Sequence, residues 1–104
     1  MEIREIQKLV KHDKILWTIH VKKRLTVRRL NELDVLECLK NGEIIEDYPD
    51  DFPYPSCLIY GKTIKNKAIH VVVSIGEGLV IIVTAYEPDT IKFESDLKTR
   101  RGKQ

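Results

Sequence analysis

The spacing of apolar residues changes near the middle of the chain. As far as residue 41 they recur every three or four positions, the period of one helix face, and from residue 43 they form the β-branched, alternating runs typical of strands. The pattern predicts helices over residues 2–12, 19–29 and 32–41, then strands over residues 43–48, 56–62, 68–75 and 79–86. This order predicts an α+β fold in which N-terminal helices precede a small antiparallel β-sheet.

Polar residues mark the ends of these elements. Thr18 and Asn31 are predicted helix N-caps, because their side chains accept hydrogen bonds from backbone N–H groups of the first turn. Asn41 and Gly42 indicate where the third helix stops. The glycine-bearing residues 76–78 predict a tight connection between the last two strands, which are therefore expected to form an antiparallel hairpin.

Strict alternation along this hairpin assigns its side chains to faces. It predicts that Thr84 and Tyr86 share a face with Val80 and Ile82, and that His70 lies on the partner strand. Whether His70 and Tyr86 approach the helices depends on the tertiary structure.

One domain is expected to account for the whole chain. With 104 residues the chain is long enough for one apolar core and too short for two, so residues 1–104 are predicted to form a single α+β domain with a basic tail over residues 95–104. Cys38 and Cys57 are expected to be buried thiols without a redox role. No apolar run has the length of a membrane span or signal peptide, which predicts a cytoplasmic protein without membrane contact.

The net charge of +2 conceals an uneven distribution. Residues 1–29 carry nine Lys or Arg against three acidic residues, residues 30–60 carry one against eight, and residues 61–104 carry eight against five. A basic surface of this kind attracts an anionic partner such as RNA, and the acidic segment is expected to neutralise part of it. Ordinary solvated surface charge is the alternative interpretation.

A basic run over residues 19–29 is the strongest functional pattern. His20, Arg24 and Arg28 recur every four residues, so on a helix they form one cationic stripe suited to a phosphate. An imidazole also transfers protons near neutral pH, whereas a guanidinium group does not. The same stripe is therefore compatible with RNA binding and with RNA cleavage.

Cleavage without a metal ion needs a base for the ribose 2′-hydroxyl, cations for the charged phosphorane and an acid for the leaving oxygen. His20 with Arg24 and Arg28 supplies the first two. His70 and Tyr86 are candidates for the remaining proton transfer if the sheet packs beneath the basic helix. For His70 the structural alternative is a strand histidine that is bonded to a neighbouring backbone or lies on a solvated face. For Tyr86 it is a tyrosine with a buried ring and a hydrated hydroxyl.

Other site types are not indicated. The sequence has no glycine-rich phosphate loop, no nucleophile elbow and no zinc-ligand spacing, so neither a cofactor nor a metal ion is expected. Acidic pairs at residues 46–47 and 50–51 are better explained by a solvated loop than by a divalent ion. Additional RNA contacts are predicted for these five residues: Lys23, Arg29, Thr84, Arg100 and Arg101. The tail that also contains Lys98 and Lys103 is expected either to be frayed or to form a second phosphate-binding arm.

The chain also resembles a known family in its motifs. These are His20-x3-Arg24-x3-Arg28, Leu30-x3-Asp34-Val35, Gly42-x-Ile44-Ile45, Tyr48-Pro49-x-Asp51-x-Pro53-x-Pro55, Gly61, Ile69-His70-Val71-Val72 and Thr84-Ala85-Tyr86-x-Pro88. Over about residues 15–94 the chain is similar to a small uncharacterised bacterial and archaeal domain family, itself thought to be distantly similar to RelE-like and BrnT-like toxins.

The resemblance implies a RelE-like or BrnT-like α+β fold and an RNA-cleaving toxin, with the ribosome and a small antitoxin as further partners. It implies site residues on the second helix, at His20, Arg24 and Arg28, and on the strands, at His70, Thr84 and Tyr86. Members of the family usually have glycine where this chain has Arg29. A left-handed turn is less favourable for arginine, so the helix junction is expected to differ here.

Three hypotheses follow. The first is a metal-independent endoribonuclease of toxin type. The second is a non-catalytic RNA-binding or protein-interaction module that uses the stripe only for attachment. The third is a structural partner domain in which Arg24 and Arg28 pair with the acidic loop of the same chain.

Overall fold

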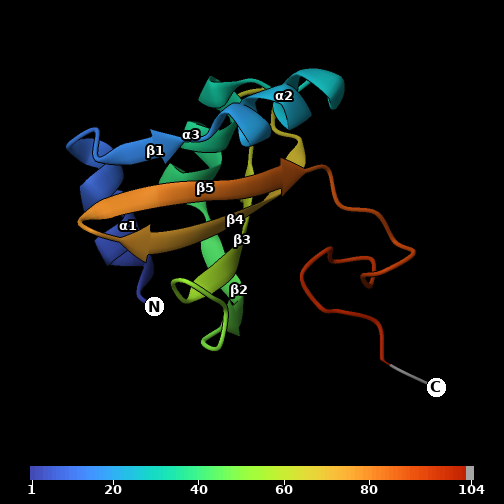
Figure 1. The fold of residues 1–104 in the computed structure, drawn as a ribbon. Coiled ribbons are helices and arrows are strands. Elements are labelled where there is room, and N and C mark those ends of the chain that lie inside the picture. Colours follow the sequence, from blue (N-terminus) through green and yellow to red (C-terminus); the bar gives the residue numbers. More distant parts are fainter. Residues whose placement is uncertain (103–104) are drawn as a thin grey trace.

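A mixed β-sheet with helices on one face forms the body of the protein. The computed structural model describes residues 1–102. Its elements, in chain order, are α1 (Ile3–Lys11), β1 (Ile15–Trp17), α2 (Ile19–Val27), α3 (Glu32–Asn41), β2 (Glu43–Tyr48), β3 (Ser56–Lys62), β4 (Ala68–Gly76) and β5 (Leu79–Tyr86) (Figure 1). The α+β fold is therefore confirmed, and the four predicted strands and three predicted helices lie within about two residues of their predicted bounds.

The strands are ordered β1-β5-β4-β3-β2 across the sheet. The neighbours from β2 to β5 run antiparallel, as expected, whereas β1 pairs parallel with β5 through residues 15–17 against residues 80–82. The prediction of a purely antiparallel sheet is therefore wrong for one strand, β1. Three residues are too few to show a strand pattern. An apolar run of this length directly before an N-cap instead indicates a connecting segment that leads into α2.

The predicted caps define where the helices begin. The Oγ1 atom of Thr18 accepts a hydrogen bond from the backbone N–H of Val21 at 3.0 Å. At the start of α3, Asn31 and Asp34 form a reciprocal capping box, with bonds of 2.9 and 3.0 Å. Both N-cap predictions are confirmed, and α2 and α3 consequently enter the fold at fixed points.

The core lies between the helices and one face of the sheet. Val21 and Leu25 of α2 and Val35 of α3 are buried with sheet residues such as Val71 and Ile82. Helix α3 comes so close to β3 that a Cβ atom on Gly61 would lie 2.6 Å from a helix carbonyl oxygen. Any larger residue at this position would push the helix away from the sheet.

Both cysteines are part of this core. Cys38 and Cys57 are fully buried free thiols, and burial raises the pKa of each to about 12. A thiol with so high a pKa carries almost no thiolate at neutral pH, so its reactivity is low. Their predicted burial is confirmed.

A β-bulge at Val83 reverses the alternation of β5. The register between β4 and β5 skips this residue, so Thr84 and Tyr86 lie on the same face as His70, whereas Ile82 faces the helices. The prediction that Thr84 and Tyr86 share a face with the residues before the bulge is therefore wrong. One extra residue moves every later side chain to the opposite face.

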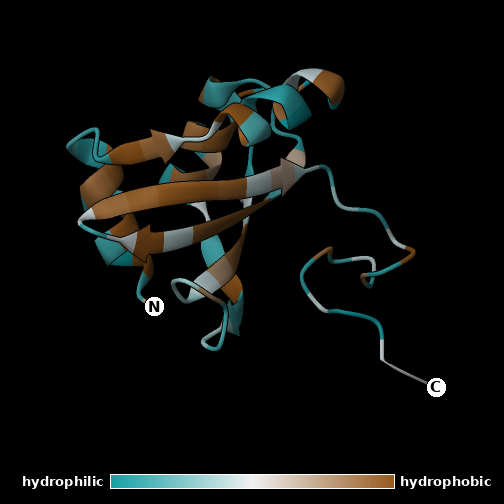
Figure 2. Ribbon diagram, viewed as in Figure 1, coloured by the Kyte–Doolittle hydropathy of each residue, from teal (hydrophilic) through white to brown (hydrophobic). Residues whose placement is uncertain are grey.

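The segment after β5, residues 87–102, packs against the sheet end and is mostly hydrophilic (Figure 2). Its anchor is Phe93, which is 2% exposed and whose ring centroid lies 4.6 Å from that of His70. A bridge between Phe93 and Arg100 closes the segment into a loop. This part of the tail is thus ordered, and Lys103 lies outside the described residues.

Candidate functional site

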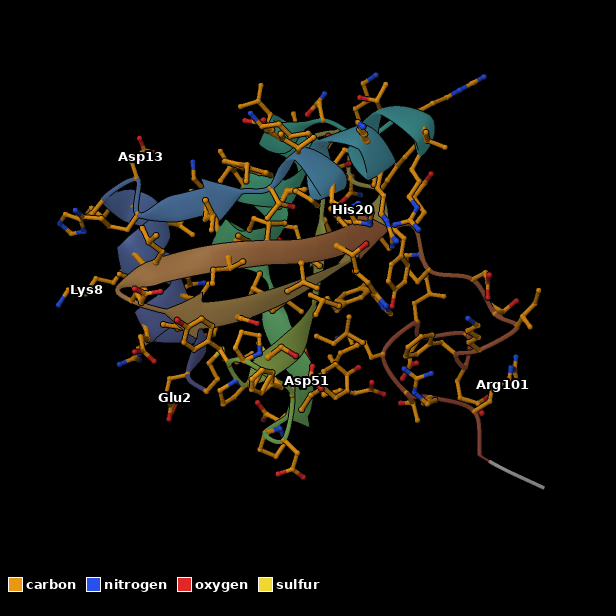
Figure 3. The ribbon with its side chains drawn as sticks, viewed as in Figure 1. Glu2, Lys8, Asp13, His20, Asp51 and Arg101 are labelled. Atoms are coloured by element: carbon orange, nitrogen blue, oxygen red, sulfur yellow. The ribbon has the colours of Figure 1, made fainter. Side chains whose placement is uncertain are left out.

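Helix α2 presents the predicted basic stripe to solvent. Val21 and Leu25 hold the helix on the core, and the residues between them point away from it. His20, Arg24 and Arg28 are all exposed. Figure 3 shows His20 near the C-terminal end of β5. The three side chains are therefore accessible to a ligand in solution.

The first two members of the stripe contact each other. The Nη2 atom of Arg24 lies 3.2 Å from the Nε2 atom of His20. Because a guanidinium group can only donate, Nε2 is the acceptor and the proton of the neutral imidazole is on Nδ1. The pair thus has a charged donor held against a potential proton acceptor.

Arg28 connects α2 to the exposed edge of the sheet. Its Nη1 atom donates to the Thr84 hydroxyl at 3.0 Å and to the Ala85 carbonyl at 2.8 Å. Strand β1 covers β5 only as far as residue 82, so a guanidinium group takes the place of a further strand here. These bonds fix the direction of Arg28, and in residues 1–102 its Nε and Nη2 atoms make no other hydrogen bond.

The end of α2 adopts the conformation that glycine favours, with arginine in its place. Arg29 has φ +58°, and its N–H donates to the Thr26 carbonyl at 3.1 Å. The N–H of Leu30 donates to the Leu25 carbonyl at 2.9 Å, which completes a Schellman motif. Arg29 thus adopts the left-handed turn itself, held by these two hydrogen bonds and by the packing of Leu30 on the core. A difference from the junction of other family members stays a prediction.

Carboxylates do not neutralise the stripe. Over the described residues, Arg24, Arg28, Lys23 and Arg29 have no acidic partner within 4.0 Å, and the nearest ion pair on α2 joins Lys22 to Glu32 at 3.9 Å. The ion pairs required by the hypothesis of a structural partner domain are therefore not formed. The acidic segment instead pairs mainly with the tail.

His70 and Tyr86 form a second cluster on the opposite face of the sheet. The Nε2 atom of His70 donates to the Leu97 carbonyl at 2.6 Å, so its Nδ1 accepts from the Tyr86 hydroxyl at 3.2 Å. Burial lowers the pKa of His70 and raises that of Tyr86, while Arg100 and Arg28 both act to lower the pKa of Tyr86. His70 is fully buried, neutral and bonded at both nitrogens.

In the described part of the chain, His20 is not hydrogen-bonded to this cluster. His20 lies on the helix side of the sheet and His70 beneath the tail. Arg28, at the end of α2, reaches round the sheet edge to Thr84 on the His70 face. His70 fits the structural alternative, a strand histidine bonded to a backbone carbonyl.

Three tail cations face carboxylates of the same chain. Arg100 binds Glu46 through two hydrogen bonds of 3.0 Å, which lowers the pKa of that carboxyl group. Lys98 pairs with Glu43 at 3.1 Å. Arg101 pairs with Glu94, also at 3.1 Å. Over residues 95–102 the tail is neither frayed nor an open cationic arm, because Lys98, Arg100 and Arg101 hold it on β2 and close its own loop.

Two features of this surface were not predicted from the sequence. One is the role of Phe93 as the residue that covers His70, although an aromatic residue in a polar tail is itself a signal of docking. The other is a small basic pocket that includes Lys65 and Lys67. Lysines in a turn carry no periodic pattern, so only the tertiary structure reveals their position beside Arg29.

In residues 1–102 no three His, Cys, Asp or Glu side chains are grouped as metal ligands would be. None of the helices described is long and apolar enough to cross a membrane.

Comparison with known proteins identifies one match. Residues 17–87 match a domain family described only as a domain of unknown function (DUF4258). The matched region contains the α2 stripe and all of β2 to β5, and it ends before the tail. No curated protein and no solved structure matches the chain. The expected similarity to RelE-like and BrnT-like toxins stays a prediction.

Proposed function

The chain belongs to this family of unknown function, and we propose from its own geometry that it binds RNA, with α2 holding phosphates of the strand. One observation supports the proposal most directly. Arg24 and Arg28 lie one turn apart on an exposed helix without a carboxylate partner, whereas Arg100 and Arg101 each have one. Guanidinium groups that have no carboxylate partner are available for bidentate bonds to phosphate.

The surroundings of the two arginines favour a nucleic acid strand. Lys23 and Arg29 add charge on the same helix and at its end. Thr84 holds Arg28 in place and so takes part indirectly. Because their guanidinium groups already bind carboxylates, we leave Arg100 and Arg101 out of the proposed interface.

Binding is tested with purified protein and a fluorescent single-stranded RNA. Arg24→Ala should weaken binding at least about fivefold, and it should reduce the slope of log affinity against log salt by about 0.7 for each phosphate that the protein no longer neutralises. Arg4→Ala on α1 is the matched control, since it removes the same charge from an exposed helix position outside the stripe. Equal effects of the two substitutions would remove the basis of the proposal.

RNA cleavage is the second candidate, favoured by the contact between His20 and Arg24. When a phosphate takes the guanidinium donor, the Nε2 lone pair of His20 becomes free to accept the proton of the ribose 2′-hydroxyl. The 2′-oxygen then attacks phosphorus, Arg24 and Arg28 stabilise the phosphorane, and the 5′-oxygen leaves with a proton from water. The products are a 2′,3′-cyclic phosphate and a 5′-hydroxyl.

This mechanism assigns the base to His20 and leaves His70 and Tyr86 out of proton transfer. Purified protein should then cleave RNA, alone or with ribosomes, and His20→Ala should abolish the products while retaining salt-sensitive binding. Products that persist in His20→Ala, or an absence of products under both conditions, would leave RNA binding as the function. A ribosome-dependent toxin with a neutralising antitoxin is the biological form in which we propose this activity.

A further inference from the structure

A small basic pocket lies where the stripe ends. It is enclosed by the junction between α2 and α3, by the turn between β3 and β4, and by Glu87 at the start of the tail, and its volume is about 130 Å³. Arg29, Lys65 and Lys67 are among its lining residues. Arg29 lies more than 30 positions before the two lysines in the sequence, and the fold brings all three cations to one hollow.

Hydrogen bonds fix the backbone that carries these three residues. On one side, the left-handed Arg29 is held by the Schellman motif of α2. On the other, the turn is closed by hydrogen bonds from Thr63 N–H to the Lys67 carbonyl at 2.8 Å and from Lys67 N–H to the Thr63 hydroxyl at 3.1 Å. Asn66, at φ +63°, reverses the chain between the two lysines. The site is thus built on two hydrogen-bonded turns, each with a residue in the left-handed conformation.

The pocket has an excess of positive charge. Its two acidic lining residues are Asp34 and Glu87. Asp34 already accepts the Asn31 backbone N–H in the capping box of α3, which also satisfies that helix end. Neither lysine nor Arg29 has a carboxylate within 4.0 Å in the part of the chain described. An anion that enters would meet three cations with unused donors.

The pocket is continuous with the proposed RNA-binding surface. Arg29 follows Arg28 directly in sequence, and Arg28 donates to the Ala85 carbonyl, two residues before Glu87. We propose that the pocket binds a further phosphate of the same RNA strand, which thus runs from α2 across the helix junction to the β3–β4 turn. The inference rests on the proposed RNA binding and specifies the path of the strand.

Salt-dependent binding of a fluorescent twelve-nucleotide oligouridylate tests this path. Lys65→Ala combined with Lys67→Ala should weaken binding about three- to tenfold and reduce the slope of log affinity against log salt by about 0.7, the value for one phosphate contact to a single strand. Glu87→Gln should have the opposite effect and strengthen binding, because it removes a negative charge from the pocket.

The control is Lys8→Ala combined with Lys11→Ala, which removes the same charge from the last turn of α1. Figure 3 shows Lys8 at the opposite end of the sheet from His20. If wild type binds and the two double variants behave alike, the path is wrong and RNA binding through α2 stands. If wild type does not bind the oligonucleotide, both proposals fail. Unfolding curves that match wild type establish that each variant is folded.

Discussion

Arg29 has a side chain that is unfavourable for the backbone conformation at its position but supplies positive charge to the basic pocket. Its φ of +58° lies in the left-handed region, where a Cβ atom is unfavourable by about 1 kcal/mol. The side chain that causes this cost also lines the basic pocket. Thr18 and Asn31, by contrast, occupy positions where side chain and backbone requirements agree, and such residues are the ones that sequence patterns predict well.

Replacing Arg29 separates its two roles. Arg29→Gly should raise the free energy of unfolding by about 1 kcal/mol relative to Arg29→Ala, because only glycine relieves the left-handed conformation. Both variants lose the same cation and should bind RNA equally weakly. Urea denaturation of the two variants provides the comparison, and equal stabilities would show that the turn carries no such cost.

His70 should make stability depend on pH. Burial holds the pKa of His70 below its usual value of 6.5, although the Leu97 carbonyl and Glu46 act to raise the pKa and Arg100 to lower it. The unfolded chain thus binds a proton more readily than the folded one. This residue's contribution is complete above pH 6.5 and is lost as the pH falls below that value toward the folded pKa.

The measurement is the fall in melting temperature between pH 7.5 and pH 5.5. It should be smaller in His70→Gln, whose neutral amide can both donate to a carbonyl and accept from a hydroxyl but does not titrate. His12 and His20 are exposed and are present in both proteins, so their contributions cancel. An unchanged pH dependence would argue against a buried neutral imidazole.

At the scale of elements, helices and long strands followed the hydrophobic pattern closely. The failures have local causes: β1 has only three residues, and the bulge at Val83 adds one residue that no propensity marks. The bulge matters for the site, since it places Thr84 and Tyr86 on the face of His70. A sequence pattern assigns side chains to sheet faces by strict alternation along the strand. One extra residue in a bulge reverses the assignment of every residue after it.

The contact between α2 and β5 should be visible in stability. Arg28→Ala removes bonds to Thr84 and Ala85 and should lower the free energy of unfolding by about 1 kcal/mol. Arg24→Ala removes only an exposed contact to His20 and should change the free energy of unfolding by less than about 0.5 kcal/mol. Chemical denaturation distinguishes the two, and equal losses would mean that Arg28 does not brace the edge of the sheet.

The whole molecule depends on contacts that no local pattern contains. The tail crosses the sheet end because Arg100 reaches Glu46 over 54 positions and Phe93 covers His70. The sequence indicated the separate acidic and basic stretches, but it did not indicate which residues form ion pairs with each other. The excess of acid in residues 30–60 was expected to neutralise part of the basic surface. Glu32 pairs with Lys22 of the basic helix, whereas Glu43 and Glu46 anchor the tail.

Phe93 is expected to provide most of this anchoring. Phe93→Ala should lower the free energy of unfolding by about 3 kcal/mol, because it empties a buried site between His70 and the Arg100 guanidinium group. Ile91→Ala, at a position that is 81% exposed in the same segment, should have an effect below about 0.5 kcal/mol. Similar losses in both variants, measured by urea unfolding, would contradict a docked tail.

The cover that Phe93 and Leu97 place over His70 gives the protein an internal chemical reporter. His12 and His20 are open to an imidazole-modifying reagent, whereas the ring of His70 is shielded as long as the tail remains in place. The acylation pattern of three histidines therefore distinguishes a closed sheet end from an opened one. A partner that displaces the tail would reveal itself by a third labelled peptide, without any knowledge of what that partner is.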